Sequence, residues 1–208
     1  MIVACLDLEG VLVPEIWIAV AEKTGIDDLR LTTRDISDYD KLMKHRLSIL
    51  DKHGIDINLI QDVISKVEPL PGAVEFMNKL REKFQIIILS DTFYQFGLPL
   101  MKKLGNPTLF CHDLVVDEAG KIVDYKLRMA DQKREAVKRL KELNFNVIAS
   151  GDSYNDTNML SVADRGVLFC PPQNVINEFP QYPVALNHEE LFNYFVKAEK
   201  EILNNKKY

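Results

Sequence analysis

The chain of 208 residues carries a formal net charge of −5, with 47% hydrophobic and 27% charged residues. This composition is typical of a globular protein, and its mildly acidic balance argues against nucleic acid or an anionic membrane as the main partner. The first residues lack the basic region and long apolar stretch of a signal peptide, and no run approaches the length of a membrane span.

Three cysteines, Cys5, Cys111 and Cys170, lie at unrelated spacings in or beside apolar runs. Buried, reduced thiols are therefore expected, and with them a cytoplasmic location.

The first part of the chain predicts one strand followed only by helices. Residues 2–6 are apolar enough for a strand that is buried on both faces, as in a parallel sheet. Apolar residues then recur at helical spacing in three segments, 14–23, 38–53 and 56–66. Because no convincing strand interrupts residues 14–69, this stretch is interpreted as a helical cap domain inserted after the first strand.

The rest of the chain alternates helices and strands. Strands are predicted at 84–89, 109–116, 121–127, 146–150 and 166–169. The strands 109–116 and 121–127 are expected to form a hairpin. Helices are predicted at 73–83, 93–104, 131–143, 153–163 and 187–203. This alternation predicts an α/β fold with a doubly wound, mainly parallel sheet, formed by residues 1–13 and 70–208.

Polar side chains follow three of the predicted strands, at the point where each strand ends. Asp7 and Glu9 follow the first strand, Ser90-Asp91-Thr92 the second, and Gly151-Asp152 to Asp156 a later one. In open α/β sheets ligands bind beyond the carboxyl ends of the strands, so parallel strands would bring these clusters to one edge of the sheet. The convergence of three clusters that are far apart in sequence favours a functional site.

The residue types in these clusters suit the binding of a phosphate and a metal. Asp7 and Glu9 are two positions apart, so in an extended strand both side chains share a face. The carboxylates and the amide of Asp152, Asn155 and Asp156 are hard oxygen ligands of the kind that Mg²⁺ prefers. Hydroxyls and backbone N–H groups at a helix N-terminus, as expected after Ser90, bind phosphate readily.

Each cluster also has a purely structural interpretation, which the residues alone leave open. Asp7 and Glu9 can be solvated acids at a strand end. Ser90, and likewise Asp152 and Ser153, can be helix N-caps. Lys133, near the start of a charged helix where a cation is electrostatically disfavoured, can be one more solvated lysine.

Together these pieces resemble the haloacid dehalogenase-like phosphohydrolases, and the resemblance covers essentially the whole chain. The four motifs of that family match, in order, Asp7-Leu8-Glu9-Gly10, Ser90, Lys133 and Gly151-Asp152 to Asp156. The helical stretch 14–69 stands where the family places a type 1 cap on a Rossmann-like core. Any one of these motifs is weak evidence, whereas four in order are highly specific.

Within the family the chain resembles the phosphoserine phosphatase branch, in which the cap binds the amino acid end of the substrate through a Glu and an Arg. Glu15 and Arg46 stand in suitable places. The segment 9–15 is similar to the bifunctional phosphoserine phosphatase and homoserine phosphotransferase enzymes. Three departures from ordinary members favour that subgroup: Glu9 replaces the usual Asp, Asp91 follows the motif-two Ser in place of Gly, and Glu15 lies one position closer to Asp7.

The resemblance implies a reaction through an aspartyl phosphate, with Asp7 as the nucleophile and Glu9 as the general acid and base. It implies Mg²⁺ held by Asp7, the main-chain carbonyl of Glu9, and Asp152, with Asp156 holding the metal shell. Ser90, Lys133 and Asn155 would contact the phosphate, while Arg46 and Glu15 would bind the carboxylate and the ammonium of phosphoserine. Asp91 is a further candidate for substrate binding, but an acid beside a phosphate is unfavourable unless its side chain points away or only its backbone N–H is used. After serine leaves, homoserine would be a possible acceptor beside water.

Two other functions are kept as alternatives. One is a phosphatase of the same fold for another small phosphomonoester. The other is a receiver-like signalling domain in which Asp7 is phosphorylated to switch a partner. A receiver is typically shorter, carries its aspartate on a later strand and lacks a helical cap, so this alternative fits the sequence less well.

Overall fold

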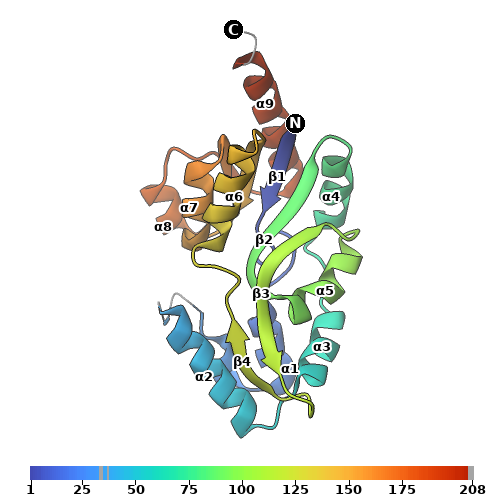
Figure 1. Ribbon diagram of the computed structural model, residues 1–208. Coiled ribbons are helices and arrows are strands. Elements are labelled where there is room, and N and C mark those ends of the chain that lie inside the picture. Colours follow the sequence, from blue (N-terminus) through green and yellow to red (C-terminus); the bar gives the residue numbers. More distant parts are fainter. Residues whose placement is uncertain (33–34, 37, 206–208) are drawn as a thin grey trace.

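The computed structural model describes residues 1–32, 35–36 and 38–205. Within these residues, seven strands form one sheet in the order β4-β3-β2-β1-β5-β6-β7 (Figure 1). The pairs are parallel except for β3 and β4, which run antiparallel. The prediction of an α/β fold with a mainly parallel sheet is confirmed. The strands are β1 Ile2–Leu6, β2 Gln85–Phe93, β3 Thr108–Val116, β4 Ile122–Lys126, β5 Asn146–Gly151, β6 Arg165–Phe169 and β7 Val184–Ala185.

β1 lies in the centre of the sheet because its side chains can be buried on both faces. Leu6 is paired with Ile88 of β2 and with Ser150 of β5. The pairing with β5 continues for one residue beyond the strand, since the backbone N–H of Asp7 donates to the carbonyl of Ser150 at 3.0 Å. The backbone of Asp7 is thereby fixed at the carboxyl end of the central strand.

Helices cover both faces of the sheet. Ala4 and Leu6 belong to one apolar cluster with helices α4 and α9, while Val3 and Cys5 belong to a second cluster with α6 and α7. Figure 1 shows α6, α7 and α8 on one side of the strands and α4 and α5 on the other. These helices are α4 Ala73–Arg81, α5 Tyr94–Lys103, α6 Gln132–Glu142, α7 Tyr154–Val162, α8 Gln173–Glu178 and α9 His188–Asn205.

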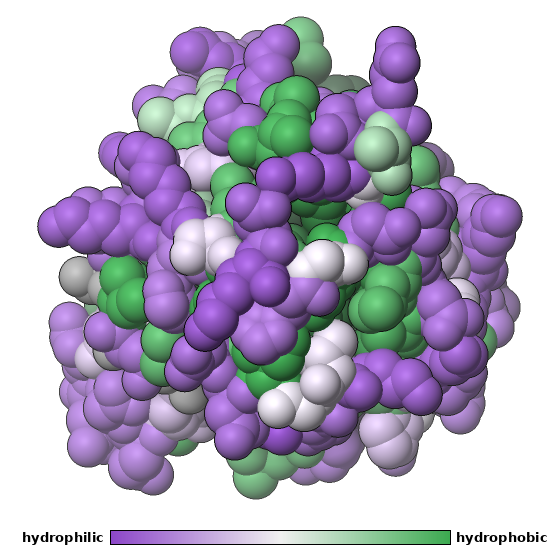
Figure 2. All heavy atoms as spheres, turned by 90° about the horizontal axis from the view of Figure 1, so that it is seen from below, coloured by the Kyte–Doolittle hydropathy of each residue, from purple (hydrophilic) through white to green (hydrophobic). Residues whose placement is uncertain are grey.

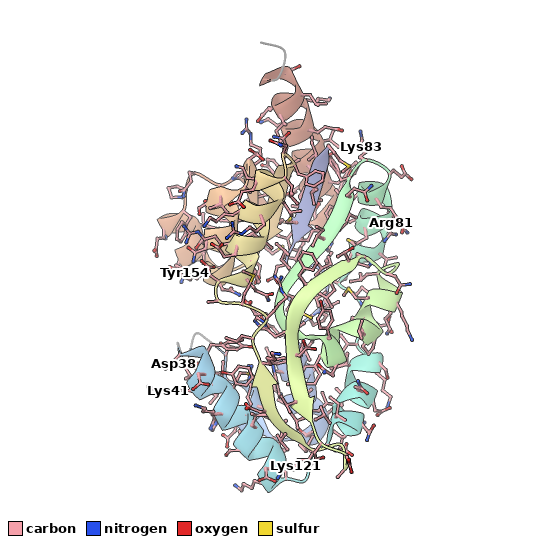
Figure 3. The ribbon with its side chains drawn as sticks, in the orientation of Figure 1. Asp38, Lys41, Arg81, Lys83, Lys121 and Tyr154 are labelled. Carbon is pink, nitrogen blue, oxygen red and sulfur yellow. The ribbon has the colours of Figure 1, made fainter. Side chains whose placement is uncertain are left out.

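The segment between β1 and α4 is helical, and its helices gather at the end of the molecule opposite the N-terminus (Figure 1). They are α1 Ile16–Thr24, the short 3₁₀ helix η1 Asp27–Arg30, α2 Tyr39–Lys52 and α3 Ile57–Ser65. The side chain of Asp38 caps α2 by accepting from the N–H of Lys41 at 3.2 Å, and both are labelled in Figure 3. Asp56 caps α3 in the same way, through the N–H of Leu59 at 2.9 Å.

The β3–β4 hairpin reaches these helices. The N–H of Ile57 donates to the carbonyl of Gly120 at 2.9 Å, and Lys121 Nζ lies 2.6 Å from Asp51 Oδ1 (Figure 3). The apolar cluster that contains Leu6 also runs without a break into α1 and α3. The division into a core of residues 1–13 and 70–208 and a cap of residues 14–69 therefore stays a prediction. Seen from below, hydrophilic side chains cover most of this face and apolar ones form separate patches (Figure 2).

The structure differs from the predicted elements at β2. That strand extends to Phe93 instead of ending at residue 89, and its pairing with β3 shifts register between Leu89 and Phe93. Ser90 and Thr92 are therefore buried inside an irregular strand end and do not begin a helix. The elements η1, α8 and β7 were not predicted, since four, six and two residues are too short to show a periodicity.

No helix among the described residues is long and apolar enough to cross a membrane.

Candidate active site

Asp7 is buried at the carboxyl end of β1, with 5% of its surface exposed. Its Oδ1 accepts from the backbone N–H of Leu8 at 2.7 Å and lies 2.9 Å from Lys133 Nζ. Burial, followed by the charge of Asp156, raises the pKa of Asp7 well above its usual value, although Lys133 opposes this. The interpretation of Asp7 as a solvated acid is wrong.

Glu9 lies on the turn after Asp7 and reaches the first residue of α1. Its Oε1 accepts from the N–H of Ile16 at 2.7 Å, whereas Glu15, at the N-cap position of α1, makes no capping bond with its side chain. Burial, followed by the charge of Glu15, raises the pKa of Glu9 to about 7. The longer side chain at this position thus satisfies a helix N-terminus and places a carboxyl group of raised pKa in the cavity that Asp7 also lines.

Asp152 and Asp156 reach the same place from the turn between β5 and α7. Asp156 is fully buried, and its Oδ2 accepts from the N–H groups of Asp152 at 3.0 Å and Ser153 at 3.1 Å. The N-cap residue of α7 is Ser153, which forms a capping box with Asp156, so the N-cap interpretation is correct for Ser153 and wrong for Asp152. Gly10 has φ +78°, and a Cβ there would lie 2.6 Å from the carboxyl carbon of Asp152, so the close approach of the two turns requires glycine.

Lys133, in the first turn of α6, is 3% exposed, so the interpretation of it as a solvated residue is wrong. Its Nζ lies 2.8 Å from Asp156 Oδ1, 2.9 Å from Asp7 Oδ1 and 3.7 Å from Asp91 Oδ2. Burial alone would lower the pKa of Lys133, but the charges of these carboxylates raise it well above its usual value. The side chain is therefore a fixed cation.

Asp91 is held by a set of polar side chains. Its Oδ1 accepts from Gln132 Nε2 at 3.2 Å and its Oδ2 from Asn155 Nδ2 at 3.3 Å, while His112 Nε2 lies 3.7 Å from Oδ1. Burial alone would raise the pKa of Asp91, but Lys133 and these hydrogen bonds lower it below its usual value. Ser90 does not cap α5, whose N-cap residue is Phe93, so the N-cap interpretation of Ser90 is wrong.

Arg46 projects from α2 and is buried, with 7% of its surface exposed. One of its terminal nitrogens donates to the carbonyl of Leu31 at 2.8 Å, and its guanidinium lies 4.6 Å from the centre of the Trp17 ring. Its Nε is buried and has no hydrogen-bond partner among the described residues. A buried guanidinium with an unused donor is available to an anionic ligand.

One cavity of about 480 Å³ joins these features. The predicted site residues that line it are Asp7, Glu9, Glu15, Arg46, Ser90, Asp91, Lys133, Asp152 and Asn155. Asp156 does not line the cavity, but it forms an ion pair with Lys133, which does. Tyr39 of α2 also lines the cavity, and its hydroxyl donates to the carbonyl of Asp91 at 3.0 Å.

Several residues of the site were not predicted, namely Trp17, Tyr39, Leu42, His112, Gln132 and Tyr154. Tyr154 stands at a variable position of the fourth motif and the others belong to no motif, while Trp17 and Leu42 have the spacing of ordinary apolar helix positions. Gln132 could have been suspected because it directly precedes Lys133 at the start of the same helix. Figure 3 shows Tyr154 at the start of α7, on the side where α2 begins.

The donor set fits a divalent cation. Oxygen atoms of Asp7, Asp152 and Asp156 lie within 4.8 Å of one another. Burial, followed by the charge of Asp156, raises the pKa of Asp152 to about 7, and the pKa of Asp7 is raised as well. Lys133 is the one cation in contact with these carboxylates among the described residues, so negative charge is in excess. Hard oxygen ligands with surplus negative charge suit such an ion.

Asp7 is thus a buried carboxylate that could act as a nucleophile beside the fixed cation of Lys133. Both line a cavity at the carboxyl edge of the mainly parallel sheet. The sequence matches the model of the haloacid dehalogenase-like hydrolases over residues 3–164. The chain belongs to this family. The match removes the receiver-like alternative.

The chain is 59% identical to phosphoserine phosphatase ThrH of Pseudomonas aeruginosa over 204 residues, which cover 98% of this chain and 100% of that protein. It is 60% identical to a phosphoserine phosphatase of Pseudomonas syringae pv. tomato over 201 residues, covering 97% of this chain and 85% of that one. A solved structure described as a phospho-aspartyl intermediate analogue of phosphoserine phosphatase has a TM-score of 0.75 at 20% identity, covering 92% of this chain and 97% of the other. At this identity the likeness to the solved structure shows the fold alone.

Proposed function

We propose that the chain is a magnesium-dependent phosphoserine phosphatase in which Asp7 is transiently phosphorylated. The observation that carries the proposal is the contact of Asp7 with Lys133, in a cavity that also holds the buried, incompletely paired Arg46. The relatives named phosphoserine phosphatase, at 59% and 60% identity over almost the whole chain, support the same substrate.

In the proposed reaction the carboxylate of Asp7 attacks phosphorus, and the bond from phosphorus to the serine oxygen breaks. Glu9 gives its proton to the departing serine oxygen. The pKa of Glu9, raised to about 7 by burial, supports a protonated carboxyl group near neutral pH. Water then attacks the phosphorus of the aspartyl phosphate, Glu9 takes a proton from this water, the bond from phosphorus to the Asp7 oxygen breaks, and inorganic phosphate leaves.

Lys133 and Ser90 would donate hydrogen bonds to the phosphoryl oxygens as negative charge spreads over them. The carboxylates of Asp7, Asp152 and Asp156 and the main-chain carbonyl of Glu9 would hold Mg²⁺. When bound, this ion supplies positive charge that offsets the crowded carboxylates and polarises the phosphoryl group. Asp91 keeps Asn155 in place beside Lys133, from where Asn155 would contact the phosphate.

The amino acid end of the substrate would lie against the helices of segment 14–69. Arg46 would pair with the carboxylate of phosphoserine and Glu15 with its ammonium group. Tyr39, which bonds to the carbonyl of Asp91, would hold α2 over the cavity and so exclude water from the first step. A phosphatase for another small phosphomonoester would have no use for Arg46 and Glu15.

We also propose homoserine as an acceptor of the phosphoryl group. A cavity of about 480 Å³ has room for an amino acid one carbon longer than serine, and the same Arg46 and Glu15 would bind it. A positioned hydroxyl can compete with water through its effective concentration.

The proposed hydrolysis is tested with purified protein, Mg²⁺ and a panel of phosphomonoesters. Phosphoserine is expected to be hydrolysed faster than phosphoethanolamine or a sugar phosphate. Equal or faster hydrolysis of the compounds that lack a carboxylate would contradict the proposed substrate.

A further inference from the structure

His188, the first residue of α9, contacts two carbonyl oxygens with its two ring nitrogens. Nε2 lies 2.8 Å from the oxygen of Val11 and Nδ1 lies 3.0 Å from the oxygen of Pro71. A carbonyl oxygen only accepts hydrogen bonds, and a neutral imidazole carries one N–H. Both contacts are therefore hydrogen bonds only when the ring carries two protons. In a neutral ring, one ring nitrogen without a proton would face a carbonyl oxygen, and the two acceptors would repel each other.

The two carbonyls belong to the two connections between the sheet and the helices of segment 14–69. Val11 lies on the outgoing turn, two residues after Glu9, and Pro71 lies on the returning connection. The two connections also bond directly, from the N–H of Leu70 to the carbonyl of Leu12 at 2.9 Å. His188 thus ties together the two places where the chain leaves the sheet and returns to it.

The ring of His188 is buried among aromatic side chains and the returning connection. The residue is 6% exposed, and its ring lies between Phe169, with centroids 4.6 Å apart, and Phe76, with centroids 5.4 Å apart. The returning connection passes the ring at Gly72, whose φ of +84° is a left-handed conformation that favours glycine.

The charges near His188 decide whether the ring can hold a second proton. A cation in the first turn of a helix is disfavoured by the helix dipole, and Glu189 and Glu190 in the same turn offset this. On α4, Glu75 and Lys79 face the same hollow and pair with each other at 2.7 Å. The outgoing turn, the returning connection and β6 contribute carbonyls and aromatic faces, both of which favour a cation.

We propose that His188 is a positioning residue of the active site, an imidazolium whose two N–H groups hold the turn that carries Glu9 against the returning connection. The effect of His188 on the reaction rests on the proposed function, in which Glu9 acts on the substrate. The protonation state of His188 does not depend on that function, so an experiment can test the two separately.

The first measurement is the protonation of the ring, by NMR of protein labelled with ¹⁵N-histidine. The chain has four histidines, so the spectrum is simple, and the variant His188→Phe identifies the signals of His188. At about pH 7 both ring nitrogens of His188 are expected to carry a proton, because each lies within hydrogen-bond distance of a carbonyl oxygen. An unprotonated ring nitrogen of His188 at this pH overturns the proposal, and this measurement on the wild-type protein decides the matter even if the variant does not fold.

The second measurement compares the turnover of phosphoserine by His188→Phe and by the matched control His53→Phe. The Phe ring keeps the packing against Phe76 and Phe169 but donates to neither carbonyl. Because the turn of Glu9 loses its anchor while Arg46 and Glu15 are untouched, kcat is expected to fall about tenfold and KM to change less than about twofold.

The pH profile separates positioning from a general loss of stability. In the wild-type protein, kcat is expected to fall at high pH with the midpoint that NMR gives for His188, and this limb should be missing in His188→Phe. Equal kcat values for the two variants, or the same high-pH limb in His188→Phe, overturn the proposal. If the wild-type protein does not act on phosphoserine, the proposed function fails while the NMR result still stands.

Discussion

Lys133 and Asp156 form an ion pair from which solvent is excluded, with Nζ 2.8 Å from Oδ1, and the same Nζ lies 2.9 Å from Asp7. One cation thus contacts two buried carboxylates that are far apart in the sequence. This relationship fixes the distance between the turn after β1 and the turn after β5, and it has a consequence for stability that differs from that of a surface ion pair.

Lys133→Met is expected to lower the free energy of unfolding of the metal-free protein by about 3–5 kcal/mol, because it leaves buried charges without a partner. Lys138→Met on the same helix is the matched control. Lys138 pairs with Glu135 at 2.8 Å but is 40% exposed, so its loss should change stability by less than about 0.5 kcal/mol. Urea unfolding measures both, and equal effects would show that Lys133 has no special role in the fold.

Asp7→Asn is expected to abolish turnover by orders of magnitude, since an amide cannot form the phosphorylated intermediate. The fold should remain intact, because the variant removes a carboxylate whose ionisation burial already disfavours. Release of phosphate from phosphoserine measures the first effect, and thermal unfolding the second. Loss of only a few-fold in rate would mean that another group accepts the phosphoryl group.

Asp152 should make the stability of the metal-free protein depend on pH. Its pKa is raised from 3.8 to about 7, so the folded state resists ionisation of this group. Its contribution to stability is therefore fully present below about pH 4 and lost as the pH rises to about 7. Asp152→Asn removes this contribution, so the variant should lose less stability than wild type between those pH values. Urea unfolding in the presence of a chelator measures the difference.

Mg²⁺ provides the complementary test of the same carboxylates. A ligand that binds only the folded state raises stability by about 2.7 kcal/mol at a concentration of 100 times its dissociation constant. Added Mg²⁺ is expected to raise the thermal midpoint of the wild-type protein, and to do so much less in Asp152→Asn. An equal rise in both proteins would place the metal elsewhere.

Arg46→Ala is expected to lower kcat/KM for phosphoserine by roughly 10²-fold or more, because the carboxylate of the substrate loses its buried partner. Phosphoethanolamine has no carboxylate, so its hydrolysis should be affected much less. The control Arg30→Ala removes an arginine of the same segment that is 43% exposed and paired with Glu22 and Asp27. Equal losses on both substrates would show that Arg46 is structural.

The sheet and the position of the site could be predicted from sequence because both depend on local signals. Apolar runs followed by Asp7, Ser90 or Asp152 indicate strands of an α/β fold and the edge of the sheet at which ligands bind. The contacts of Asp91 could not be predicted, because its partners His112, Gln132 and Asn155 come from three different elements, and His112 and Gln132 match no motif. The irregular end of β2 was also missed, since a register shift leaves no pattern in the sequence.

The bond of Glu9 to Ile16 explains why a longer acid at this position need not disable the reaction. Its Oε1 is fixed by the N–H of Ile16 at 2.7 Å, so the extra methylene spans a distance to α1 that an aspartate would not cover. Glu9→Asp should therefore free the start of α1 and leave the carboxyl group less well oriented. Turnover of phosphoserine is expected to fall, with part of the loss coming from this helix end.

The same variant tests whether Glu9 helps the enzyme to use homoserine. With phosphoserine, Mg²⁺ and millimolar homoserine, phosphorus NMR is expected to show phosphohomoserine beside inorganic phosphate, because a bound and oriented hydroxyl competes with water. Inorganic phosphate as the sole product would leave a plain phosphatase. If transfer occurs, Glu9→Asp should lower the ratio of transfer to hydrolysis, since a longer alcohol depends more on an oriented base than water does. An unchanged ratio would show that the extra methylene serves α1 and has no part in the choice of acceptor.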